Sequence, residues 1–104
     1  MTNELKINMK ANDTLSKDGE ILVKVWFEGN TYEHKNEIKT IGGYSWASYE
    51  KKWTKFVKLS QLQEEIEKAA EIGAEAAISE QEFLESRSYK LAEMIAKDYH
   101  EKNK

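Results

Sequence analysis

Residues 38–53 constrain the fold more than any other part of the 104-residue chain. Two isoleucines three residues apart, Ile38 and Ile41, indicate one turn of helix, and the Gly-Gly pair that follows ends it. Trp46 and Trp53 then lie on either side of a polar turn. A helix end, a hairpin and two indole rings so close together predict a compact module built around tryptophan.

The first 58 residues have the alternating pattern of β-strands. The pattern is clearest from Glu20 to Phe27, with β-branched and aromatic residues on one face and Leu22, Lys24 and Trp26 on the other. A turn at residues 28–30 predicts a hairpin. We expect strands at Leu5–Lys10, Glu20–Phe27, Thr31–Glu33, Tyr44–Ala47 and Lys52–Lys58, a polar loop over Asn12–Gly19 and a short helix around Lys35–Ile41.

Residues 59–104 predict two helices. A serine followed three residues later by Gln or Glu, the form of a capping box, occurs at Ser60 and at Ser79. An apolar stripe at helical spacing runs from Leu62 to Ala77 in the first helix. Gly73 lies inside this stripe, either as a close-packing position or as an interruption. The second helix continues almost to the C-terminus.

These patterns predict an α+β fold: a three- to four-stranded antiparallel sheet with a short inserted helix and two C-terminal helices. We expect a single domain over residues 1–104, made of a sheet module (1–58) and an acidic helical segment (59–104). The C-terminal helices either cover one face of the sheet or project from it as an arm. The expected core consists of Val23, Val25, Phe27, Ile38, Ile41, Trp46, Trp53, Val57, Leu62, Ile66, Leu91 and Ile95.

The composition argues against several functional classes. The chain has no cysteine, so it has neither disulfides nor thiolate metal ligands. His34 and His100 have no ligand-like neighbour one helical turn away, and we predict no metal, no cofactor and no catalytic residue. No apolar run reaches about 18 residues and the N-terminus lacks a signal-peptide core, so we expect a cytoplasmic protein without a membrane segment.

Charge is distributed unevenly along the chain. Residues 1–58 carry ten lysines against eight acidic residues, a balance of +2, whereas residues 59–104 carry five lysines and one arginine against eleven acidic residues, a balance of −5. Glutamates at helical spacing line one face of the first predicted helix. This face is either a solvated surface or a site for a basic partner. Its members are Glu64, Glu67, Glu71 and Glu75.

The hairpin over residues 44–58 interleaves aromatic rings with lysines. Single-stranded nucleic acid is bound by this combination, because rings stack on bases while ammonium groups follow the phosphates. Trp46 and Trp53 are expected in the core instead, and a single arginine in the chain argues against specific base readout. The candidate contacts are Tyr44, Tyr49, Lys51, Lys52, Lys55 and Lys58.

Three short runs, Gly29-Asn-Thr-Tyr32, Ile38-Lys-Thr-Ile-Gly-Gly-Tyr-Ser-Trp46 and Lys51-Lys-Trp53, together resemble a small module of phage, plasmid and bacterial proteins. That module consists of a strand, a short helix ending in Leu-Gly-Gly, a tryptophan and a Lys-x-Trp hairpin. It occurs beside helicases and primases, or alone in mobile-element proteins. The resemblance covers about residues 21–57. Tyr44-Ser45 stands where the module usually has an arginine, which removes a cation from an inherited nucleic-acid site.

In size and style the chain also resembles the small acidic inhibitors that phages and plasmids carry against host nucleases, including anti-CRISPR proteins. This resemblance implies a non-enzymatic inhibitor in the bacterial cytoplasm. It would bind a basic surface of a type II effector nuclease through the glutamate face and interfere with guide RNA or DNA loading. The alternative is a small single-stranded nucleic-acid-binding accessory protein that uses the Lys/aromatic hairpin. Either protein could be a monomer or a homodimer through its C-terminal helices.

Overall fold

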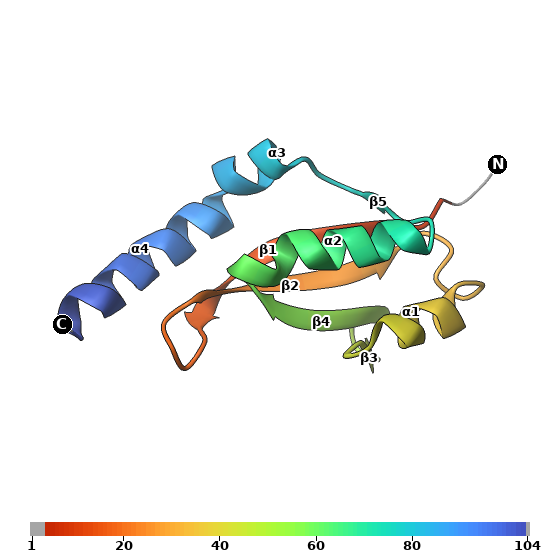
Figure 1. The fold of residues 1–104 in the computed structure, drawn as a ribbon, viewed down its shortest axis with the longest axis horizontal. Coiled ribbons are helices and arrows are strands. Elements are labelled where there is room, and N and C mark those ends of the chain that lie inside the picture. Colours follow the sequence, from red (N-terminus) through yellow and green to blue (C-terminus); the bar gives the residue numbers. More distant parts are fainter. Residues whose placement is uncertain (1–3, 104) are drawn as a thin grey trace.

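The computed structural model describes residues 4–103 and shows an α+β fold with a mixed sheet (Figure 1). Across these residues, none of the helices combines the length and apolar character needed to cross a membrane. The helices are α1 (Lys35–Ile41), α2 (Leu62–Glu71), α3 (Glu80–Glu85) and α4 (Arg87–Lys102), and the 3-10 turn η1 (Leu59–Gln61) precedes α2. The strands, in their spatial order, are β3 (Ser45–Ala47), β4 (Lys52–Lys58), β2 (Ile21–Glu28), β1 (Lys6–Leu15) and β5 (Glu75–Ala76).

The three central strands have two faces of different character. Antiparallel pairing places Ile7 opposite Phe27 and Val23 opposite Val57, and all four side chains are buried. We call this side of the sheet the core face. The alternate positions of β1, β2 and β4 point the other way, and none of their described side chains is fully buried. We call this second side the open face.

The helices pack on the core face and along β1. Helix α2 lies over the sheet and runs nearly along the direction of β2 in the view of Figure 1, and its Leu62 and Ala69 are buried. Ile38 of α1 and Phe83 of α3 belong to the same buried cluster. Helix α4 follows β1 and contributes Ala92 to it. One apolar core therefore joins the sheet to the helical segment.

The C-terminal end of α4 is held by the turn between β1 and β2. The His100 Nε2 atom lies 3.1 Å from the carbonyl oxygen of Gly19, and the Tyr99 hydroxyl donates to the Lys17 carbonyl at 3.4 Å. Gly19 has a φ of 81°, and a Cβ atom there would overlap the Tyr99 ring. Because both the backbone and the close contact require glycine, this turn is shaped to receive α4. Of the two arrangements expected for the C-terminal helices, α4 thus packs along the sheet.

The α+β class is confirmed, and the sheet is larger than predicted. It has five strands and is mixed because the short β5 runs parallel to β1, pairing at Lys6 and Ile7. The expected strand Thr31–Glu33 is wrong, since these residues form a turn that leads into α1. The polar loop predicted over Asn12–Gly19 begins later than expected, because β1 continues to Leu15. The pairing of β1 with β2 is irregular after Ala11.

A glycine ends α2 earlier than the sequence pattern suggests. Gly73 has a φ of 90°, its N–H donates to the Ala70 carbonyl at 3.0 Å, and the Ala74 N–H donates to the Ala69 carbonyl at 2.9 Å. This pair of bonds is a Schellman motif, which satisfies the last carbonyls of a helix. Gly73 is therefore an interruption. The chain leaves the helix after it, and Glu75 lies in β5 instead of on the glutamate face of α2.

Of the two predicted capping boxes, the second is confirmed. The Ser79 hydroxyl accepts from the Glu82 N–H at 3.0 Å, and the Glu82 carboxylate accepts from the Ser79 N–H at 3.1 Å. The first box does not form, because the Ser60 N–H donates to the Glu20 carboxylate and η1 intervenes before α2. A further serine, Ser86, caps α4 and so divides the predicted second helix into α3 and α4.

The core prediction is wrong for Trp46 and Leu91, which are 48% and 49% exposed. Trp46 lies on the short edge strand β3 and packs edge-on against Trp53, with ring centroids 5.5 Å apart. Leu91 lies about 100° around α4 from the buried Ala92, outside the side of the helix that enters the core. Burial is confirmed for Val23, Val25, Phe27, Ile38, Val57 and Leu62, whereas Ile41, Trp53, Ile66 and Ile95 are half-buried.

Candidate functional site

The open face combines two large aromatic rings with five lysines. Trp26 on β2 and Phe56 on β4 are diagonal neighbours, because Phe56 pairs with Lys24 while Trp26 pairs with Thr54. Phe56 is 52% exposed. The polar side chains around these rings are Lys6, Asn8 and Lys10 from β1, Lys24 and Glu28 from β2, and Lys52, Thr54 and Lys58 from β4.

Hydrogen bonds fix the orientation of the Trp26 ring. Its Nε1–H donates to the Glu28 carboxylate at 2.8 Å, and the Asn8 side-chain amide donates to the same oxygen at 3.3 Å. The Lys52 ammonium lies 5.1 Å from the centre of the indole ring, within the range of a cation–π contact. The ring is therefore held in place before any ligand binds, which lowers the entropic cost of stacking on it.

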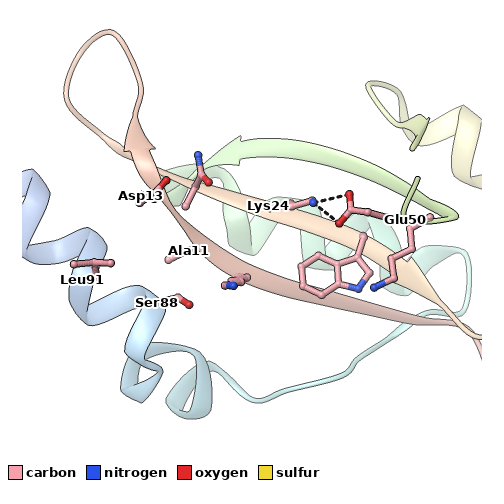
Figure 2. Close-up of a pocket in the computed structure, with 10 residues that line it drawn as sticks. Ala11, Asp13, Lys24, Glu50, Ser88 and Leu91 are labelled. Atoms are coloured by element: carbon pink, nitrogen blue, oxygen red, sulfur yellow. Dashed lines mark hydrogen bonds and ion pairs between the residues drawn. The ribbon is translucent and has the colours of Figure 1, made fainter. Parts of the chain in front are cut away.

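Trp26 and Lys52 also line a shallow hollow of about 580 Å³ on the open face. Figure 2 shows its walls: Ser88 and Leu91 of α4 lie on one side, and the Lys24–Glu50 pair lies on the other. The Lys24 ammonium donates to both Glu50 carboxylate oxygens at 2.7 Å, which lowers the pKa of that carboxyl. Lys10 and Lys52 also line the hollow, so its lining contains three ammonium groups.

The five lysines differ in how far their charge is neutralised. Lys24 pairs with Glu50, and Lys58 pairs with Asp18 at 3.0 Å. The pKa of Asp18 is lowered to about 2, first by the Ser16 hydroxyl and then by the Lys58 ammonium. Among residues 4–103, no carboxylate oxygen lies within 4.0 Å of the ammonium of the other three, which are Lys6, Lys10 and Lys52. These three are the cations most available to an anionic ligand.

The residues predicted to contact nucleic acid do not form one surface. Lys52 and Lys58 lie on the open face. Tyr49, which is 99% exposed, and Lys51 lie at the turn between β3 and β4, next to one end of that face. The other two, Tyr44 and Lys55, point to the opposite side of the sheet and bind a carboxylate of α2.

That carboxylate belongs to Glu65, which is only 3% exposed. One of its oxygens accepts from the Lys55 ammonium at 2.9 Å and the other from the Tyr44 hydroxyl at 2.8 Å. Burial, and secondly the bond to Glu65, raise the pKa of Tyr44, so its hydroxyl remains a donor well above neutral pH. Because all three groups are engaged with one another, this cluster fixes α2 and the β3–β4 hairpin to each other.

The predicted acidic residues are also divided by the fold. Glu64, Glu67 and Glu71 are exposed along α2, with the Glu64 carboxylate 3.5 Å from the Lys68 ammonium. Glu75 lies on β5, at the edge of the sheet. The remaining three carboxylates form a row of helical spacing on the helix side of the molecule, away from the lysines of the open face.

Sequence reasoning did not select Lys10, Lys24 and Trp26 as site residues. The pattern that could have found them is the alternation in the first two strands, which puts Lys6 and Lys10 on the same side as Lys24 and Trp26. Within the described part of the chain, no three His, Cys, Asp or Glu side chains are placed to hold a metal ion together.

A comparison of the chain with protein-family models, with curated proteins and with solved structures found no match.

Proposed function

We propose that the protein binds single-stranded nucleic acid on the open face of its sheet. The observation that carries this proposal is the pair of the half-buried Trp26 and the exposed Phe56, two rings on a sheet face that carries five lysines. Rings and ammonium groups serve the two parts of a nucleotide: bases stack on the rings, while the backbone phosphates contact the cations.

A single strand suits this surface better than a duplex. The rings of Trp26 and Phe56 lie on a pleated sheet beside a shallow hollow, and they can reach only bases that are not already stacked in a helix. Arg87, the single arginine of the chain, belongs to α4, so the bidentate guanidinium contacts that commonly read guanine are not available on this face. We therefore expect binding with little sequence preference.

Charge reversal of the three lysines without ion pairs tests the proposal. The wild-type protein is expected to bind a fluorescein-labelled oligothymidine with a dissociation constant on the order of 10 µM at low salt. Changing Lys6, Lys10 and Lys52 together to Glu should weaken binding about 30-fold or more, and it should reduce the salt slope of log K by about 2, because three phosphate contacts are lost. Fluorescence anisotropy over a series of salt concentrations measures both quantities.

Two matched controls show whether a loss of affinity comes from the open face itself or from a change in net charge or aromatic content. Lys90, Lys97 and Lys102 of α4 are exposed, and changing them to Glu alters the net charge equally but should change the affinity much less. Phe56→Ala should weaken binding about tenfold through lost stacking, whereas Tyr32→Ala, at a site 77% exposed but remote from this face, should not. Absence of binding by the wild type at low salt, or equal losses in the two lysine triples, would refute the proposal.

A second candidate function rests on the glutamate row of α2. Glu64, Glu67 and Glu71 are all exposed, and residues three or four apart on a helix are separated by about 5–6 Å. Such a row can occupy a basic groove that normally receives nucleic acid, as an anti-CRISPR-like inhibitor of a type II effector nuclease would. If this is the function, the variant with these three glutamates changed to Lys no longer inhibits target cleavage, whereas the variant with Lys6, Lys10 and Lys52 changed to Glu still inhibits it. If instead the glutamate variant still inhibits cleavage and the lysine variant does not, the open face is the functional surface.

A further inference from the structure

Helix α4 carries an apolar and charged stripe outside the side that packs into the core, and Leu91 of this stripe also borders the hollow of the open face. Its packed side contributes the buried Ala92 and the half-buried Ala96 to the core. The exposed side carries Arg87, Leu91, Met94 and Asp98, whose spacings of four, three and four residues place them in one line along the helix. Leu91 and Met94 are 49% and 68% exposed, so two large apolar side chains lie adjacent to each other in solvent.

The order of residues in this stripe is self-complementary. Arg87 lies four residues before Leu91, and Asp98 lies four residues after Met94. The midpoint between Leu91 and Met94 is therefore equally far from the two charged residues. A two-fold axis through this midpoint relates a helix to an antiparallel copy of itself. In that arrangement each arginine lies opposite an aspartate and each leucine lies opposite a methionine.

We propose that a second copy of the chain covers this stripe, with the two α4 helices antiparallel. The apolar pairs form the centre of the contact, and the Arg87–Asp98 pairs close both ends. Antiparallel helices also place the positive N-terminal end of one beside the negative C-terminal end of the other. Asp98 pairs with Lys102 of its own helix at 3.0 Å, so its carboxylate is already held on the surface of α4.

The size of the contact predicts a weak dimer. A helix of 16 residues is about 24 Å long, and one helix pair of that length buries less than the standard interface of about 1,600 Å². The protein should therefore be monomeric at low micromolar concentration and dimeric when it is concentrated roughly a hundredfold.

Sedimentation equilibrium on the full chain, with a charge swap between the two ends of the stripe, tests this arrangement. Met94→Glu replaces an exposed side chain and should abolish the dimer without unfolding the monomer. Arg87→Asp alone, and Asp98→Arg alone, each put like charges opposite one another at both ends and should weaken dimerisation at least tenfold. The double variant Arg87→Asp/Asp98→Arg restores opposite charges and should recover most of the wild-type association.

The rescue by the double variant depends on the antiparallel register, because only there does position 87 face position 98 of the second copy. A double variant that associates no better than the single variants would overturn the proposed register. A wild-type chain that stays monomeric at every concentration, or a dimer indifferent to Met94→Glu, would overturn the proposed interface. Circular dichroism of each variant shows whether the monomer has kept its fold.

Discussion

Replacing Lys55 with methionine is expected to lower the free energy of unfolding by about 3 kcal/mol. Its ammonium lies 2.9 Å from a carboxylate oxygen of Glu65, a residue that is 3% exposed. The variant leaves that charge buried with only the Tyr44 hydroxyl as a donor. An uncompensated charge in the protein interior costs far more than a lost surface ion pair. Urea denaturation followed by tryptophan fluorescence measures the change.

A double variant distinguishes the buried charge from the simple loss of a contact. When Glu65→Leu is combined with Lys55→Met, no charge is left in the interior, and about 2 kcal/mol of the lost stability should return. Lys58→Met is the matched control on the same strand, because the Lys58–Asp18 pair is exposed and its loss should change stability much less. A Lys58 variant as unstable as the Lys55 variant, or a double variant less stable than Lys55→Met, would contradict this account.

The Lys55→Met variant also distinguishes the roles of the two faces of β4. Lys55 was predicted from the sequence to contact nucleic acid, but its ammonium binds Glu65 on the core side of the sheet. Folded Lys55→Met protein should therefore bind oligothymidine as the wild type does, whereas loss of Lys52 weakens binding. Strand β4 thus contributes lysines to two purposes, stability on one face and the proposed binding on the other.

Local chemistry made several parts of the fold predictable. Alternating β-branched residues identified β2, because one face of that strand is completely buried. Helix α1 has the predicted bounds, ended by the Gly42-Gly43 pair, both at positive φ. The capping box at Ser79 marked the start of α3, because its two hydrogen bonds involve only neighbouring residues. Each of these signals is contained within about ten residues of sequence.

What remained unpredictable depended on contacts between distant segments. Alternation in β4 assigns Lys52 and Lys55 to opposite faces, but it does not say which face the helices cover. Trp46 was expected in the core because tryptophan is large and apolar, yet it lies on an edge strand where no helix covers it fully. Strand β5 has only two residues, and it pairs with β1 from a distant part of the sequence. It is too short to leave a periodic pattern. The open face was therefore visible only after the fold was known.

Phe83→Ala is expected to cost about 4 kcal/mol, the largest loss of stability from a single truncation in the helical segment. Phe83 is 2% exposed and is the buried residue of the six-residue helix α3. Its ring lies 5.3 Å from that of Tyr89 on α4, and it lines an apolar groove with Met9 of β1. The ring therefore connects both C-terminal helices to the sheet, and alanine would leave a cavity at the point where they meet.

Leu84→Ala is the control, because Leu84 is 40% exposed on the same helix and its truncation should cost about 1 kcal/mol or less. Urea denaturation measures both losses, and hydrogen exchange shows where they act. In the Phe83 variant, amides of α3 and α4 should lose protection before those of β2, because β2 is a central strand that pairs with β1 on one side and β4 on the other. Equal costs for the two variants, or protection lost first in β2, would mean that the helical segment is attached to the sheet mainly by other contacts.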